Sequence, residues 1–117
     1  MLTDLGQLAD EDFCYLTTIG QVTGQPGTIE IWFAVHERTL YMLAGSGRTA
    51  GWVKNLLCIS EVTVHIGKHH FTGRARVVED SAEDALARRL IVSKYQLRSS
   101  DDLSTWGKTA LSVAVDL

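Results

Sequence analysis

The stretch Gly45-Ser46-Gly47-Arg48 holds the residue types best suited to binding a charged group. It follows an apolar strand-like run and leads directly into apolar residues at helical spacing. A glycine turn that enters a helix presents unpaired backbone N–H groups and the positive end of the helix dipole at one place. Arg48 adds a fixed charge whose forked donors suit a phosphate. The pattern favours a site for a phosphate-bearing ligand, with an ordinary strand-to-helix connection as the alternative.

Three histidines, His65, His69 and His70, surround a second glycine turn, Gly67-Lys68. If these two residues form a hairpin turn, His65 lies directly across the strand pair from His70. Two imidazoles in this position are able to hold a metal ion. However, no third ligand lies nearby in the sequence, and such positions usually face water. The sequence therefore predicts no metal site.

Trp32 is the aromatic residue whose position most favours contact with a ligand. It shares a strand face with Glu30 and Ala34, opposite a strongly apolar face. An aromatic on the less apolar face of a barrel strand is able to form one wall of a pocket for a flat ring, and core packing is the alternative. The other large aromatics are scattered over separate elements and fit core packing: Tyr41, Trp52 and Trp106.

The sequence contains no recognisable catalytic motif of its own. It lacks a Gly-x-Ser-x-Gly nucleophile turn, a His-Glu-x-x-His zinc motif and a phosphate loop that ends in Gly-Lys-Ser. This absence favours chemistry that a cofactor carries, with the protein supplying orientation and electrostatics. We therefore assign no catalytic side chain from the sequence.

Composition indicates one ordered domain over residues 1–117. Hydrophobic residues make up 45% of the chain, and there is one proline. The net charge of −3 gives no reason to expect a nucleic-acid partner. Cys14 and Cys58 stand outside any metal-binding spacing and are expected to be small buried apolar residues. No secretory leader is recognisable and no apolar run approaches the roughly 20 residues of a membrane span, so we expect a cytoplasmic protein.

Hydrophobic periodicity predicts a mainly β fold with two helices. The first helix follows the glycine turn, and two overlapping runs, Asp80-Ser81-Ala82-Glu83 and Ser81-Ala82-Glu83-Asp84, each have the polar cap and acidic third position that would start the second. Strands joined by hairpins, with helices inserted between them, point to a small antiparallel barrel of the α+β class. The expected strands cover 13–19, 28–36, 40–44, 62–66, 71–78 and 109–116, and the expected helices cover 49–59 and 81–97, with an irregular stretch at 98–107.

Four runs of the chain together resemble a known family. They are residues 15–26 with their Thr-Thr-x-Gly pattern, the strand 29–33, the turn 45–48 with the Trp-x-x-Asn helix, and the strand 62–67. In these runs the chain resembles the deazaflavin-dependent nitroreductases, a family of flavin-binding split β-barrels related to pyridoxamine 5'-phosphate oxidase. The resemblance covers residues 13–116. It implies an FMN-binding-type split barrel of about six antiparallel strands.

The resemblance also implies a cofactor, a reaction and a set of cofactor-binding residues. The cofactor would be the reduced deazaflavin coenzyme F(420), or FMN, and the reaction a hydride transfer to a quinone- or nitro-like acceptor. The turn would meet the cofactor phosphate, the residues just before it would approach the ring through backbone groups, and the loop with Trp106 would help form the acceptor side. The implied set is Trp32, Leu43, Ala44, Gly45, Ser46, Gly47, Arg48, Trp52 and Asn55.

Two other functions stay open on the residues alone. One is a non-catalytic barrel that binds a flavin, a deazaflavin or haem, and the other is an interaction module without a ligand. A homodimer is compatible with each function, because exposed apolar strand faces of a small barrel gain cover from a second subunit. The expected partner is a small-molecule electron acceptor, without nucleic acid and without a membrane span.

Overall fold

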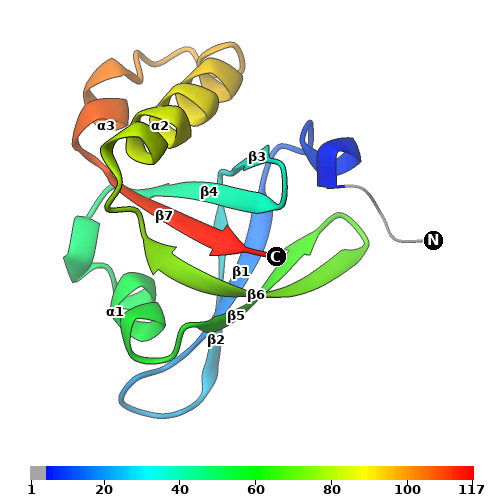
Figure 1. Ribbon diagram of the computed structural model, residues 1–117, viewed down its shortest axis with the longest axis vertical. Helices are drawn as coiled ribbons and strands as arrows, with labels where there is room; N and C mark the ends of the chain where they lie inside the picture. Colours follow the sequence, from blue (N-terminus) through cyan, green and yellow to red (C-terminus); the bar gives the residue numbers. More distant parts are fainter. Residues whose placement is uncertain (1–4) are drawn as a thin grey trace.

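A computed structural model describes residues 5–117 of the chain (Figure 1). Within these residues, seven antiparallel strands form one sheet, accompanied by three α-helices and two 3-10 turns. In chain order the elements are η1 (Leu5–Leu8), β1 (Cys14–Ile19), β2 (Pro26–Ile31), β3 (Ala34–His36), β4 (Thr39–Ala44), η2 (Gly47–Thr49), α1 (Gly51–Cys58), β5 (Glu61–Ile66), β6 (His69–Val77), α2 (Ser81–Gln96), α3 (Ser104–Thr109) and β7 (Leu111–Asp116).

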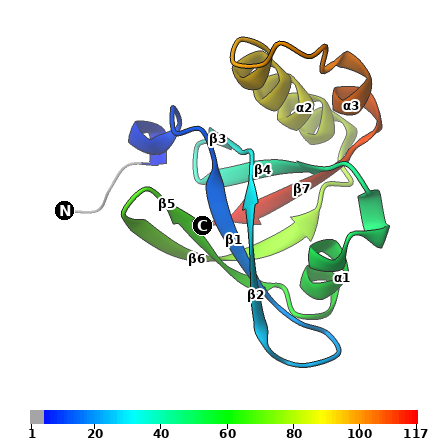
Figure 2. The same ribbon diagram turned by 180° about the vertical axis from the view of Figure 1, so that it is seen from behind.

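The sheet curls into a barrel whose two edges are joined by the chain itself. Its strand order is β2-β1-β5-β6-β7-β4-β3, so the two edge strands, β2 and β3, follow one another in the sequence. Only Trp32 and Phe33 lie between them. Figure 1 shows β6 and β7 on the near side of the barrel, and Figure 2 shows β1 and β2 on the near side. We call the gap between β2 and β3, bridged by Trp32-Phe33, the seam of the barrel.

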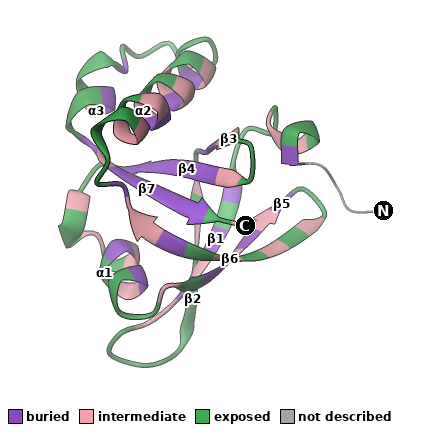
Figure 3. Cartoon of the chain, viewed as in Figure 1, coloured by how far each residue is buried: buried purple, intermediate pink, exposed green. Residues whose placement is uncertain are grey.

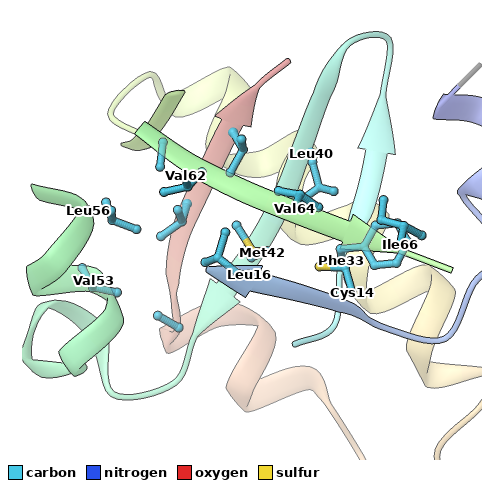
Figure 4. Packing of buried hydrophobic residues seen from close by; sticks show 14 residues of the cluster. Cys14, Leu16, Phe33, Leu40, Met42, Val53, Leu56, Val62, Val64 and Ile66 are labelled. Atoms are coloured by element: carbon cyan, nitrogen blue, oxygen red, sulfur yellow. The ribbon is translucent and has the colours of Figure 1, made fainter. Parts of the chain in front are cut away.

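Strands β4 and β7 are buried on both faces, as Figure 3 shows by their colour. On β4, Leu40 and Met42 belong to the cluster inside the barrel, whereas Tyr41 and Leu43 belong to a second cluster under α2 and α3. Successive residues of a strand point to opposite faces, so these strands need apolar residues at nearly every position. Figure 4 shows the inner cluster, with Val53 and Leu56 of α1 at one end of it.

A charged network fastens α2 to the sheet. The Arg76 guanidinium on β6 donates two hydrogen bonds to the Glu83 carboxylate, at 2.7 and 2.8 Å, and also binds Asp116 of β7. Tyr41 of β4 donates to the same Glu83 at 2.7 Å. As predicted, the Asp80 side chain caps α2, by accepting a hydrogen bond from the Glu83 N–H. The start of α2 is therefore held by β4, β6 and β7 together.

The seam is held by a single buried hydroxyl from the end of α2. The Tyr95 hydroxyl lies 3.0 Å from the backbone nitrogen of Phe33 and 3.1 Å from its carbonyl oxygen, and 2.8 Å from the carbonyl oxygen of Asp12. The Lys94 ammonium donates to the same Phe33 carbonyl at 3.0 Å. Buried backbone groups need hydrogen-bond partners. These two side chains supply them where the chain leaves one edge strand for the other.

The expected antiparallel barrel is confirmed, with seven strands in place of about six and three helices in place of two. The expected strand 28–36 is two strands, because the chain changes from one sheet edge to the other at Trp32-Phe33. Its apolar side chains do share one face, as predicted, since all of them contact the inner cluster. Helix α3 begins inside the stretch 98–107, which we expected to be irregular. The sequence did not predict this helix because its six residues show no apolar periodicity.

The prediction for the two cysteines is right for one of them. Cys14 is fully buried in the inner cluster, whereas Cys58 is exposed at the end of α1. Leu57, one of the apolar residues at helical spacing after the turn, is also exposed, while Val53 and Leu56 are buried. The face of this eight-residue helix that packs against the barrel is narrower than the set of apolar residues in its sequence. Cys58 and Leu57 fall outside that face.

Replacing Tyr95 by phenylalanine tests the role of the seam hydroxyl. The substitution Tyr95→Phe keeps the ring but leaves the buried Phe33 N–H without its partner. We expect the free energy of unfolding, measured by urea denaturation, to fall by about 1–3 kcal/mol. The matched control is Tyr15→Phe, because the Tyr15 hydroxyl makes an exposed contact of 3.4 Å with Glu30. Equal losses in the two variants would contradict this role.

Acid denaturation tests the network on α2. Hydrogen bonds from Arg76 and Tyr41 lower the pKa of Glu83 from 4.5 to about 2, against the opposing effect of burial. Its contribution to stability is complete above pH 4.5 and is lost as the pH falls through 4.5 toward 2. We expect Glu83→Gln to cost about 1 kcal/mol at neutral pH and to flatten the stability curve below pH 4.5, since the network is partly exposed. Glu79→Gln, at an exposed position, is the control and should do neither.

Candidate functional site

A hollow of about 250 Å³ opens at the seam of the barrel. Two tryptophans form its walls: Trp32, which is 36% exposed, and Trp106, whose ring stands at 89° to it at a centroid distance of 5.7 Å. Glu30, Ile31 and Leu43 complete the lining. The two indoles at right angles and the two aliphatic residues give flat apolar walls, and Glu30 adds a carboxylate, so apolar and polar groups meet in one hollow, as they do in small-molecule sites. We call this hollow the seam pocket.

The backbone of Leu43 adds a polar edge to the seam pocket. The β3–β4 hairpin turns on two residues, so its closing pair His36–Thr39 is hydrogen-bonded, and alternate residues of β4 direct their backbone groups toward β3. Pairing on that side ends at Tyr41, opposite Ala34. By the same alternation, the N–H and C=O of Leu43 point toward the seam, where β3 has left the sheet. A flat ring in the pocket would meet a peptide edge there.

Trp32 is held in place by the same residue that holds the seam. Its ring stacks on Tyr95 at a centroid distance of 4.3 Å, with 4° between the planes. Burial raises the pKa of Tyr95 to about 12, so its hydroxyl stays protonated at neutral pH. A second hollow of about 240 Å³ lies on the other side of Trp32 and includes Asp12 and Arg98, whose side chains pair at 2.6 Å. Trp32 therefore lines both hollows, the seam pocket and the hollow that holds the Asp12–Arg98 pair.

The glycine turn has the features that the sequence suggested. Gly47 adopts a positive φ of 62°, and Ala50 caps α1 without any side-chain hydrogen bond. The first N–H groups of α1 therefore have no capping side chain to accept from them. Arg48 is exposed, and within residues 5–117 it makes no hydrogen bond or ion pair. Uncapped amides and an unpaired guanidinium lie together here, as an anion site requires.

The predicted cofactor-binding residues are divided between two hollows. Trp32 and Leu43 line the seam pocket, but Arg48 lies at the rim of a separate hollow of about 500 Å³ between α1, β6 and α2. Three acidic side chains line that hollow, Glu79, Asp80 and Glu83, together with Arg76, which is paired with Glu83. A phosphate inside it would face the carboxylates of Glu79 and Asp80, which Arg76 does not pair. The glycine turn lies next to the seam pocket. Gly45 is so close to Trp106 that a Cβ atom added to this glycine would lie 3.5 Å from the indole nitrogen.

Seven residues of the predicted set are not part of the seam pocket lining, and four of them are engaged within the chain. Asn55 uses its amide inside the chain, where it accepts from the Gln21 N–H and donates to the Thr18 hydroxyl, each at 3.1 Å. Trp52 packs against the inner cluster, and Ala44 belongs to it. The Ser46 carbonyl accepts a hydrogen bond from Thr49 within the turn. In this structure Asn55 braces α1 against the β1–β2 loop, and Trp52 and Ala44 are packing residues.

Sequence reasoning missed the most important supporting residue, Tyr95. Its helical spacing from Ala87 and Ile91 marks it as a core residue, which it is, at 2% exposure. Nothing in that spacing reveals that its hydroxyl meets the backbone of Phe33. Among residues 5–117, no group of three or more histidine, cysteine, aspartate or glutamate side chains is arranged to hold a metal ion.

Solved structures share this fold at low sequence identity. An F420-H2-dependent reductase superposes with a TM-score of 0.73 at 18% identity, covering 90% of this chain and 94% of that one. A pyridoxamine 5'-phosphate oxidase-type protein from Listeria innocua gives 0.69 at 17% identity, covering 95% and 87%. The haem storage protein of Vibrio cholerae gives 0.68 at 14% identity, covering 96% and 86%. Such identities establish the fold, a split barrel.

A search of the curated proteins finds no match. None of the helices among residues 5–117 has the length and apolar character needed to cross a bilayer. The family model described as F420H(2)-dependent quinone reductase matches residues 3–117, which is nearly the whole chain. The chain therefore belongs to the F420H(2)-dependent quinone reductase family.

Proposed function

We propose that the chain transfers a hydride from the reduced deazaflavin coenzyme F(420) to a small-molecule acceptor of the quinone or nitro type. The observation that carries this proposal is the seam pocket, with its two perpendicular indoles and the backbone edge of Leu43. The family supports the deazaflavin as hydride donor. The acceptor class rests on the sequence resemblance and on the apolar lining of the pocket.

The residues present fit a flat ring with an anionic tail. The seam pocket offers apolar walls to the ring, and the uncapped N-terminus of α1 with Arg48 offers donors to a phosphate. The contact of Gly45 with Trp106 makes the two parts adjacent, so one ligand is able to reach both. The acidic hollow beside Arg48 does not fit a phosphate. The tail is therefore assigned to the outer side of the turn, where Arg48 is free to reach it.

In this reaction the side chains position and shield, and the cofactor supplies the hydride. Because Trp32 and Trp106 are perpendicular, one indole would cover a face of the ring and the other an edge, and both would exclude water there. The Leu43 backbone is placed to hydrogen-bond a polar edge of the ring. The turn and Arg48 bind the anionic tail and so fix how far the ring enters the pocket. The resemblance also implies that Trp52 and Asn55 contact the cofactor. We include that contact in the proposal, although packing and hydrogen bonds within the chain already explain why these two residues are present.

Two related functions are distinguished by binding and turnover measured together. FMN has a short phosphate tail that needs fewer cations, so it is the alternative cofactor. A barrel that binds without catalysis is the alternative function, and the fold is shared with a haem storage protein. Stoichiometric binding of coenzyme F(420) with reduction of quinones or nitroaromatics supports our proposal. Binding without reduction of any acceptor would favour the non-catalytic barrel, and failure to bind coenzyme F(420), FMN or haem would exclude both functions.

A homodimer is part of the same proposal. Phe13 and Tyr15 on the β1 side of the barrel are each 38% exposed, next to the partly exposed Trp32. Apolar surface of this kind gains from cover by a second copy.

The substitution Arg48→Ala tests the anionic-tail site. We expect it to weaken binding of coenzyme F(420) and of FMN about tenfold, because each loses a charge-assisted contact with its phosphate. Isothermal titration calorimetry measures both affinities. Arg89→Ala, which removes another exposed arginine from α2, is the matched control and should leave both affinities unchanged. Equal affinities for wild type and Arg48→Ala would remove Arg48 from the site.

A further inference from the structure

The tip of the β5–β6 hairpin brings two histidines together. Gly67, with a φ of 58°, and Lys68 form the two-residue turn, and Ile66 pairs with His69 to close it. The next pair outward is His65 with His70, as the sequence predicted. Because the closing pair is the hydrogen-bonded one, this next pair is of the non-hydrogen-bonded type, in which side chains lie closest. Their rings stack at a centroid distance of 3.9 Å, with 26° between the planes.

The two imidazoles are open to solvent on one side and supported on the other. Strand β7 pairs with β6 only from Arg74 to Val77, so the segment that carries His70 extends past it, and His70 is exposed. His65 is half-buried, with Tyr15 beside it on β1 at a ring distance of 6.0 Å. An ion is therefore able to approach from the exposed side, while the sheet restrains the rings from behind.

Neither imidazole is engaged by another polar group. Within the described part of the chain, His65 and His70 make ring contacts but no hydrogen bond and no ion pair. Their nitrogens are therefore available as ligands without breaking a hydrogen bond or ion pair of the fold, and only the mutual ring stack has to tilt open for both lone pairs to meet one ion. Neutral imidazole suits nickel, copper and zinc, and it does not suit magnesium or calcium.

We propose that His65 and His70 chelate a divalent late transition-metal ion across the β5–β6 hairpin. The sheet register already fixes the two ligands side by side, so the second imidazole binds with a high effective concentration once the first has bound. Water completes the coordination, because residues 5–117 contain no third side chain that joins the pair in a metal-ligating group. The site is therefore exchangeable, and it shares no residue with the lining of the seam pocket.

Titration with Ni²⁺, followed by isothermal calorimetry in a non-coordinating buffer at neutral pH, tests the site. All proteins carry Cys58→Ser, because that thiol is exposed and is itself a metal ligand. We expect one equivalent of Ni²⁺ to bind, and His65→Ala or His70→Ala to weaken it at least tenfold by removing the chelate. His36→Ala, which removes an exposed histidine at the end of β3, is the matched control and should leave the affinity unchanged.

A thermal melt gives a second, independent readout. The ion links β5 to β6, so Ni²⁺ should raise the melting temperature of the Cys58→Ser protein but not that of the variant that also lacks both histidines. Mg²⁺ should raise neither. Nickel binding by the double variant with wild-type affinity would overturn the proposal. So would a loss of affinity in His36→Ala as large as that in His65→Ala.

Discussion

The barrel is closed by two residues of covalent chain, and most of the structure follows from this constraint. Where β2 gives way to β3, backbone groups lose the neighbouring strand that would pair with them. At Phe33 the missing partners come from Tyr95 and Lys94 of α2. At Leu43 the backbone edge stays turned toward the seam pocket. The same interruption therefore creates a need for α2 and leaves a place for a ligand.

The attachment of α2 explains the composition of the strands beneath it. Because the helix covers the outer face of β4 and β7, these strands are apolar on both faces, which is unusual in an antiparallel sheet. Polar contacts hold both ends of the helix: Glu83 meets Arg76 and Tyr41 at its start, and Lys94 and Tyr95 meet the Phe33 backbone at its end. Trp32 stacks on Tyr95 near the other end of the helix. The wall of the candidate site thus depends on how firmly the whole helix is docked.

Local patterns in the sequence predicted what local interactions determine. The turn at Gly67-Lys68, the register of His65 with His70 and the Asp80 cap each depend on residues a few positions apart, and all are confirmed. The division of the strand 28–36 was not predictable from its alternation, because the apolar residues keep facing the inner cluster through the break. The division arises where the chain passes from one sheet edge to the other, and the hydroxyl that satisfies the freed backbone there comes from more than sixty positions away in sequence.

The candidate site shows the same limit. Trp32 was recognisable from its place on a strand face, and Leu43 from its position before the glycine turn, and the structure places both at the seam pocket. Arg48 was recognisable as a cation beside a helix start, but its position at the rim of an acidic hollow depends on β6 and α2. Asn55 was chosen by its motif, whereas its hydrogen bonds show a brace between α1 and the β1–β2 loop.

The shortness of the link between β2 and β3 also limits how this protein is able to diverge. Three successive peptide units separate the Cα atoms of Ile31 and Ala34, so these atoms are at most about 11 Å apart. Thermal motion of the sheet cannot widen the seam between β2 and β3 beyond this span without breaking strand pairs. Related proteins that bind other ligands must therefore differ in the side chains that line the seam pocket, above all the two tryptophans. The width of the seam itself stays the same as long as the two-residue link is kept.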